Sequence, residues 1–264
     1  LALSSFAQSK IELGKQAMDS ANYEAAVNYF TDHLKVEPKS CDAYMRRSLA
    51  FAYIGDYTAS IADATMAIKY WNKKVGVPIG IPYLMRANVY ATIEDYNKAL
   101  EDLNTAIKKD KKNALCYARR GQFYYKLEAY DKAEADYRKA YELNNSDTES
   151  ALEVARCLLQ QNKLEEAATI LDNIIRYEPM QAEAKRLRAV IYYYEDDYKS
   201  FIDLYVDYLA LEHGDLDLLM YASTKEYGYA LKTVSAQLKD AEEDDRFYWR
   251  GVRARIYQLK NQYE

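Results

Sequence analysis

Small and large apolar residues alternate along this chain with a period near 34 residues. A large residue followed three positions later by a small one recurs at Tyr23/Ala26, Tyr57/Ser60, Tyr96/Ala99, Tyr130/Ala133 and, as a variant, Leu164/Ala167. The small residues are separated by 34, 39, 34 and 34 positions. A fixed period of this length is typical of stacked helical hairpins, in which each unit buries itself against its neighbours. We therefore predict successive antiparallel helix pairs rather than one closed globule.

Counting from Ala7, the repeats begin at residues 7, 41, 80, 114, 148 and 182, and certain positions keep their size. The eighth position is always small: Gly14, Ser48, Ala87, Gly121, Ala155 and Ala189. The twentieth is small in every repeat except the last, where it is Phe201, and the eleventh and twenty-fourth are mostly large. Two antiparallel helices approach closely only where small side chains meet, so we expect the helices of each pair to cross at these positions.

This alternation resembles the tetratricopeptide repeat family, over nearly the whole chain and most strongly over residues 7–180. The resemblance implies an all-α, right-handed superhelical solenoid of antiparallel helix pairs. Its expected repeats are 7–40, 41–79, 80–113, 114–147, 148–181 and 182–215, with six of them covering 7–213. The match is weaker after residue 180, because Phe201 and Tyr208 occupy places that the family keeps small. We expect a degenerate helical repeat at 216–246 and the first helix of a truncated repeat at 247–264, in a fragment of a longer protein.

An insertion of five residues between Ser60 and Ala99 breaks the period, and it is carried by Trp71 to Tyr83. The stretch is unusually apolar for a solvent loop. Two interpretations remain: it folds back on the neighbouring helices, or it is an edge on which a partner docks.

Composition favours a folded protein without catalytic chemistry. Apolar residues form 50% of the chain, and the net charge of −5 favours neither nucleic acid nor an anionic membrane surface as a partner. No stretch of 18 apolar residues could cross a bilayer. His33 and His213 lie far apart, and Cys41, Cys116 and Cys157 match no zinc spacing, so we predict buried cysteines. We expect no metal, no cofactor and no enzyme activity.

The first residues resemble the tail of an export signal. Leu1–Leu3 followed by Ser5–Ala7 is apolar and ends in small residues, so residues 1–6 are interpreted as the remnant of such a signal. This predicts an exported protein, periplasmic or associated with the outer membrane. The alternative is a cytoplasmic protein, because Ala7 also opens the first repeat.

The resemblance implies that the first helix of each repeat lines a concave groove that binds a peptide or partner protein. The residues expected to face it are Arg46, Leu49, Tyr53, Leu84, Met85, Asn88, Arg119, Gln122, Tyr125, Lys126, Leu152 and Arg156. Arginines and amides can satisfy carboxylates and backbone carbonyls, so we expect Arg46, Arg119 and Arg156 to bind carboxylates. Tyr53 and Tyr125 would supply apolar contact.

Several alternatives stay open. The carboxylate clamp of one family subgroup is not expected, because Ile11, Ile81 and Met85 replace its polar residues. The chain could instead be a self-association module, or the non-catalytic region of a larger exported enzyme or assembly factor. Binding of carbohydrate by Tyr193 and Tyr194 is the least favoured alternative, and the oligomeric state is not predicted.

Overall fold

A computed structural model describes residues 2–213, 227–240, 246, 249–251, 253–254 and 256–257. The chain divides into two compact units, Leu1–Asn145 and Ser146–Glu264, which we call the N-terminal and C-terminal units. Each is described by itself. All regular structure in the described residues is helical, which confirms the predicted all-α class.

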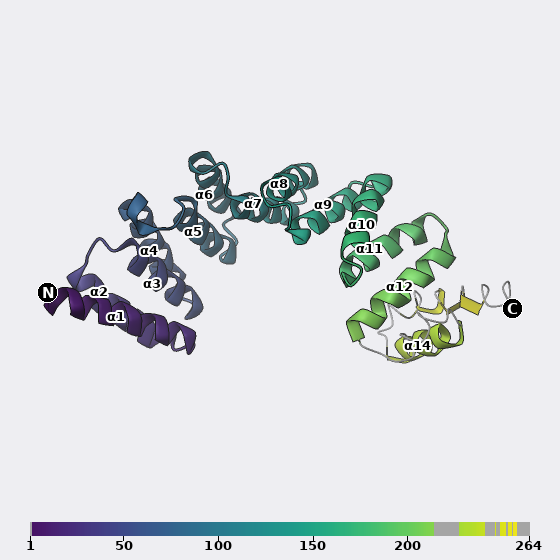
Figure 1. Cartoon of the computed structure of the whole chain (residues 1–264), viewed down its shortest axis with the longest axis horizontal. Helices are drawn as coiled ribbons and strands as arrows, with labels where there is room; N and C mark the ends of the chain where they lie inside the picture. The colour runs from purple at the N-terminus through teal and green to yellow at the C-terminus, as the bar shows by residue number, and fades with distance from the viewer. Residues whose placement is uncertain are drawn as a thin grey trace. The chain divides into compact units, whose positions relative to one another are not determined.

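The N-terminal unit is a succession of helix pairs (Figure 1). Its helices are α1 (Ala2–Asp19), α2 (Tyr23–Val36), α3 (Cys41–Tyr53), α4 (Tyr57–Tyr70), η1 (Lys73–Val75), α5 (Gly80–Thr92), α6 (Tyr96–Lys109), α7 (Ala114–Lys126) and α8 (Tyr130–Leu143). The first helices of the second, third and fourth repeats begin at the residues where the period places a repeat start, Cys41, Gly80 and Ala114. The first helices also contact one another, α1 with α3, α3 with α5 and α5 with α7.

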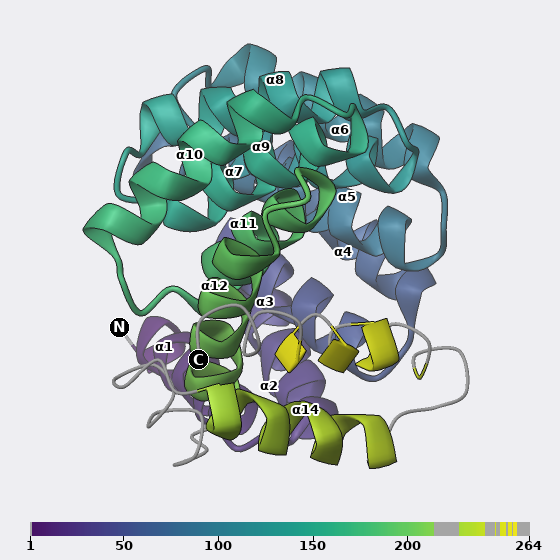
Figure 2. The same ribbon diagram turned by 90° about the vertical axis from the view of Figure 1, so that its right-hand side faces the viewer.

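The C-terminal unit continues the pattern with two further pairs. Its helices are α9 (Thr148–Gln160), α10 (Leu164–Tyr177), α11 (Ala182–Tyr194), α12 (Tyr198–His213) and α14 (Tyr227–Asp240). Val234 of α14 and Ile256 are buried in one cluster with Phe201 and Ile202 of α12. Figure 2 shows α14 running across α12. The truncated repeat expected at 247–264 lies largely outside the described residues.

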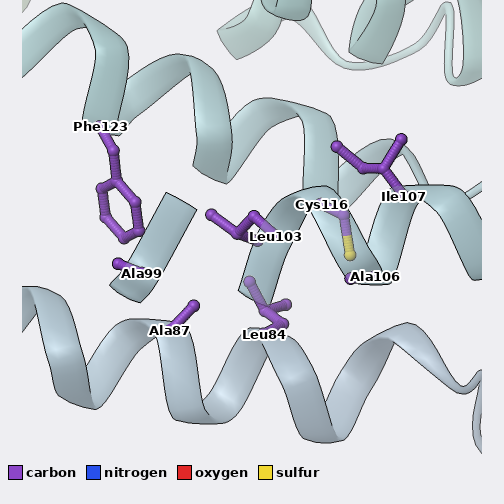
Figure 3. Close-up of a cluster of buried hydrophobic side chains, with 8 residues drawn as sticks. All are labelled: Leu84, Ala87, Ala99, Leu103, Ala106, Ile107, Cys116 and Phe123. Carbon is purple, nitrogen blue, oxygen red and sulfur yellow. The ribbon is translucent and has the colours of Figure 1, made fainter. Parts of the chain in front are cut away.

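The two helices of a pair fit together by matching residue sizes at the crossing. Gly14 faces Phe30, and a Cβ added to this glycine would lie 2.3 Å from the ring. Gly121 faces Tyr137 with a corresponding distance of 3.2 Å. Where the twenty-fourth position is Leu103, the eighth is Ala87, and both are buried in the cluster of Figure 3. In these three repeats glycine matches an aromatic ring and alanine matches leucine, which keeps the interior densely packed, whereas in the sixth repeat Ala189 is combined with Tyr205.

A serine pair replaces this apolar contact in the second repeat. Ser48 and Ser60 are both buried, and each hydroxyl donates a hydrogen bond to the other's backbone carbonyl, at 2.8 and 2.7 Å. The crossing therefore tolerates hydroxyl groups because the partner helix satisfies them.

The turn inside each pair has a fixed backbone form. The middle one of its three residues adopts a left-handed conformation, with φ between 55° and 82°, at Ala21, Gly55, Glu94, Glu128, Asn162 and Asp196. The next residue caps the second helix. Asn22, Asp56, Asp95 and Asp197 each accept a backbone hydrogen bond from the residue three positions on, whereas Ala129 and Lys163 do not.

The apolar insertion folds back on its own repeat. Trp71, Val75 and Val77 pack against a buried cluster that contains Cys41 and Met45. The Trp71 Nε1 donates a hydrogen bond of 2.9 Å to the Val77 carbonyl. The first of the two interpretations is therefore correct for the apolar side chains of this segment.

Candidate functional site

Three ion pairs, each between a half-buried arginine and a buried aspartate, position the first helices α3, α5 and α7 of the N-terminal unit. Each joins an arginine of a first helix to an aspartate sixteen residues later in the second helix: Arg47–Asp63, Arg86–Asp102 and Arg120–Asp136. Both carboxylate oxygens accept a hydrogen bond in every pair, at 2.6–2.8 Å. Such two-point contacts fix direction as well as distance, so they orient one helix against the other.

Each of these arginines also reaches the preceding pair. Arg47, Arg86 and Arg120 donate to Thr31, Thr65 and Asn104 at 2.9, 2.8 and 2.7 Å. Hydrogen bonding to the aspartate raises the pKa of Arg86 and of Arg120. Sequence reasoning missed this network, although the threefold recurrence of Arg and Asp sixteen residues apart could have revealed it.

In the second repeat, the predicted site residues form an exposed apolar patch beside a paired arginine. Leu49 and Tyr53 on α3 are 42% and 59% exposed. The Tyr53 ring stacks on Tyr23, with 4.5 Å between ring centroids. Arg46, however, is held within its own helix, because its Nε lies 3.0 Å from both oxygens of Asp42. Its charge is therefore already compensated.

In the third and fourth repeats, the predicted residues are more polar. Met85 on α5 is half-buried against the Cys41 cluster, and Asn88 is half-buried one turn later. On α7, Arg119 donates a hydrogen bond of 2.6 Å to the amide oxygen of exposed Gln122. Tyr125 packs edge-on against Tyr130, and Lys126 is exposed. Sequence reasoning left out Leu115, which is 50% exposed on the same helix.

Arg156 belongs to the C-terminal unit, where it joins two glutamates. Its guanidinium lies 3.3 Å from Glu153 and 2.7 Å from Glu183. Burial alone would raise the pKa of Glu183, but hydrogen bonding and charge from Arg186, and then the charge of Arg156, lower it overall. A ligand carboxylate would have to displace these intramolecular partners.

Two residues expected on the binding face are instead part of the core. Leu84 is 5% exposed and Leu152 is 2% exposed. Both occupy the fifth position of their repeats, as do the buried Ile11 and Met45. This position faces neighbouring helices rather than solvent, so the prediction was wrong for it.

Tyr193 and Tyr194 at the end of α11 are 42% and 67% exposed. The Tyr193 ring contacts Tyr194 and Phe201 edge-on, at 6.3 and 5.5 Å between centroids. Tyr193 therefore packs partly against its own unit, while Tyr194 presents more of its ring to solvent.

The three cysteines are buried, as predicted. Burial raises the pKa of both Cys41 and Cys116 to about 11, so these thiols are poor nucleophiles at neutral pH. In the part of the chain that the structure describes, no group of three or more His, Cys, Asp and Glu side chains is placed to hold a metal ion. No helix in that part is long and apolar enough to cross a membrane.

Family comparisons agree with the helix pairs and their crossings. A model of the tetratricopeptide repeat matches residues 11–72 and 84–148, and a second model of the same description matches residues 127–191. The chain belongs to the tetratricopeptide repeat family. Such repeats are generally non-catalytic and support a role as a protein-interaction scaffold.

Curated relatives of this tetratricopeptide repeat protein include DnaJ homolog subfamily C member 7 of Homo sapiens, 24% identical over 214 residues. That match covers 76% of this chain and 42% of the relative. The relative of Mus musculus is also 24% identical, with 78% and 43% covered. The chain thus spans less than half the length of these curated relatives.

Solved tetratricopeptide repeat structures share the fold. A protein from Parabacteroides merdae has a TM-score of 0.61 and 17% identity, covering 96% of this chain and 99% of its own. YrrB, described as having an unusual peptide-binding site, has a TM-score of 0.56 and 21% identity, with 74% and 97% covered. At these identities the likeness concerns the fold alone.

Proposed function

We propose that the chain is a scaffold that binds an extended peptide segment along the first-helix face of its N-terminal unit. We define this face by Leu49, Tyr53, Asn88, Leu115, Arg119, Gln122, Tyr125 and Lys126. The observation that carries the proposal is the row formed by Leu49, Asn88 and Gln122. These residues occupy the same position of three successive first helices that contact one another.

The chemistry of the face suits an extended backbone. The amides of Asn88 and Gln122 can donate to and accept from peptide groups, and Leu49 and Tyr53 can cover apolar side chains. Arg119 has a neutral amide as its hydrogen-bond partner, whereas Arg46 is paired with a carboxylate. Arg119 is therefore the better candidate for binding a ligand carboxylate, and Arg46 the poorer one.

The described relative YrrB supports the peptide class of ligand, since it carries a peptide-binding site on the same fold. A micromolar dissociation constant, about −8 kcal/mol, is the affinity expected of such a site. The arginine–aspartate pairs of α3, α5 and α7 keep the helices in place, which lowers the ordering cost of binding.

Peptide selection followed by calorimetry tests the proposal. Peptides selected from a random library on the immobilised chain would be titrated into the wild type and into Leu49→Ala/Asn88→Ala/Gln122→Ala. We expect at least a tenfold weaker binding for this variant, with unchanged helix content. Tyr141→Ala, which alters an exposed tyrosine of α8, is the matched control. Equal affinity of both variants and the wild type would place the peptide elsewhere.

Export of the protein is a separate proposal, which rests on residues 1–7 alone. Cell fractionation of the full-length protein with N-terminal sequencing of its mature form tests it. A cytoplasmic protein that retains its leader residues would refute it.

A further inference from the structure

Two neighbouring turns of the N-terminal unit carry a dense group of lysines. Lys69 at the end of α4 is followed by Lys73 and Lys74 in the turn before α5, and Lys108 and Lys109 at the end of α6 are followed by Lys111 and Lys112 in the turn before α7. All seven are exposed, and we call them the lysine edge. The turns lie side by side, because a Cβ built on Gly80 would lie 3.1 Å from the side-chain nitrogen of Asn113.

The charge of this edge is almost uncompensated. Asp110 is the single acidic residue within residues 69–80 and 108–113, and it accepts a hydrogen bond from the Lys112 backbone. The net charge of −5 for the whole chain conceals this local excess. The other inter-repeat turns differ: the one before α3 contains a single lysine, Lys39, together with an exposed Glu37, and the turns before α9 and α11 have no lysine.

Helix stability explains only part of the group. Lys69, Lys108 and Lys109 lie in the last turns of α4 and α6, where a cation favours the helix dipole. Lys73, Lys74, Lys111 and Lys112 lie beyond these α-helices. Like charges so close together repel one another, and no contact in the fold offsets that cost for these four.

The neighbouring residues distinguish between anionic partners. Nucleic acids are usually bound with arginines and free aromatic rings, but this edge has no arginine. Its two rings are already engaged, since Trp71 donates to Val77 and Tyr70 stacks on Tyr44. Between the lysines lies the insertion, with Gly76 and Pro78 exposed and Val75 half-buried. The apolar side chains of the insertion pack inward, so the exposed lysines offer charge alone, which suits an anionic lipid headgroup layer.

We propose that the lysine edge docks the N-terminal unit on an anionic lipid surface. The contact is peripheral and electrostatic, so it should weaken steeply with salt. It uses the turns and leaves the first-helix face of the proposed peptide site free. The two surfaces can therefore be tested separately.

Vesicle co-sedimentation with the whole chain tests this assignment. The probes are vesicles of phosphatidylcholine alone and vesicles with about 30% phosphatidylglycerol, each at about 0.05 M and about 0.5 M salt. We expect binding only to the anionic vesicles at low salt. Lys73→Gln/Lys74→Gln/Lys111→Gln/Lys112→Gln should bind them at least about tenfold more weakly.

The matched control removes four exposed lysines outside the edge, as Lys98→Gln/Lys132→Gln/Lys163→Gln/Lys199→Gln. It has the same net charge as the test variant and should bind like the wild type. Equal loss in both variants would mean that total charge, not the edge, matters, and the assignment would fail. Absence of wild-type binding would also refute it. Tighter binding of polyglutamate or of a DNA duplex, at equal charge concentration, would show a polymeric partner instead.

Discussion

The N-terminal and C-terminal units treat the same pair of repeat positions differently. In the second to fourth repeats of the N-terminal unit, the seventh and twenty-third positions hold Arg47/Asp63, Arg86/Asp102 and Arg120/Asp136, whereas the first repeat holds the uncharged Leu13/Tyr29. In the C-terminal unit, the corresponding residues are Val154/Ile170 and then Arg188/Leu204. The chain thus contains three ionic pairs, two uncharged pairs and one mixed pair at equivalent places.

The mixed pair shows what the network does. Arg188 is 8% exposed, and the twenty-third position of its own repeat holds Leu204 in place of an aspartate. It turns to Asp172 of the preceding helix at 2.9 Å, and its guanidinium lies 3.7 Å from the Tyr192 ring centroid. A buried charge must be paired, whereas an apolar pair needs no such contact. The repeat therefore tolerates loss of both partners better than loss of one.

Replacing the arginine by methionine should give the largest difference between the units. Arg120→Met leaves Asp136, whose side chain is 8% exposed, without its partner, and should cost about 3 kcal/mol. Arg188→Met leaves Asp172, which is 49% exposed and can be solvated, so the change should stay within about 1 kcal/mol. Urea unfolding would measure both, since Trp71 lies in one unit and Trp249 in the other.

The apolar pair of the fifth repeat provides the control. Arg120→Val/Asp136→Ile installs the residues found at Val154 and Ile170, and should recover most of the stability lost in the single variant. A double variant as unstable as Arg120→Met would contradict the comparison, because the carboxylate would then not be the cause.

The crossings should give the next largest effect. Gly14→Ala forces a methyl group to within 2.3 Å of Phe30, which is fully buried, and should destabilise the N-terminal unit by about 2 kcal/mol. Gly121→Ala meets Tyr137 at 3.2 Å, and the better helix propensity of alanine should leave it near neutral. Thermal unfolding of both variants tests this difference.

A second change sharpens the test. Gly14→Ala/Phe30→Leu creates the alanine–leucine combination of Ala87 with Leu103 and of Ala155 with Leu171. The loss of unfolding free energy in the double variant should be smaller than the sum of the losses in the two single variants, by at least about 1 kcal/mol. Simple additivity would mean that the two positions do not fit by size.

The sequence was a sufficient guide to the helix pairs because size patterns repeat. The small residues at Gly14, Ala87 and Gly121 lie at the crossings, as the period predicted. The binding face was harder to predict, because Leu84 and Leu152 look like surface leucines until the neighbouring helix is placed over them. Whether the charge of an arginine is already compensated also depends on interatomic distances, which the sequence does not give. Arg46 and Arg119 are equivalent by position, but only Arg46 has a carboxylate beside it.

The caps of the second helices should give the smallest effect. Ala129 has φ −84° and ψ 62°, nearly the conformation of Asp95 with φ −83° and ψ 66°. Asp95 accepts a hydrogen bond from the Lys98 backbone, and an aspartate at residue 129 could accept one from Lys132 in the same way. Ala129→Asp should therefore stabilise the N-terminal unit by about 1 kcal/mol, and Asp95→Ala should destabilise it by a similar amount.

Lys163→Asp applies the same change to the C-terminal unit, and the signal of Trp249 should report it while that of Trp71 stays unchanged. A shift of both signals by Lys163→Asp would show that the two units unfold together, and would limit how far their differences can be measured separately.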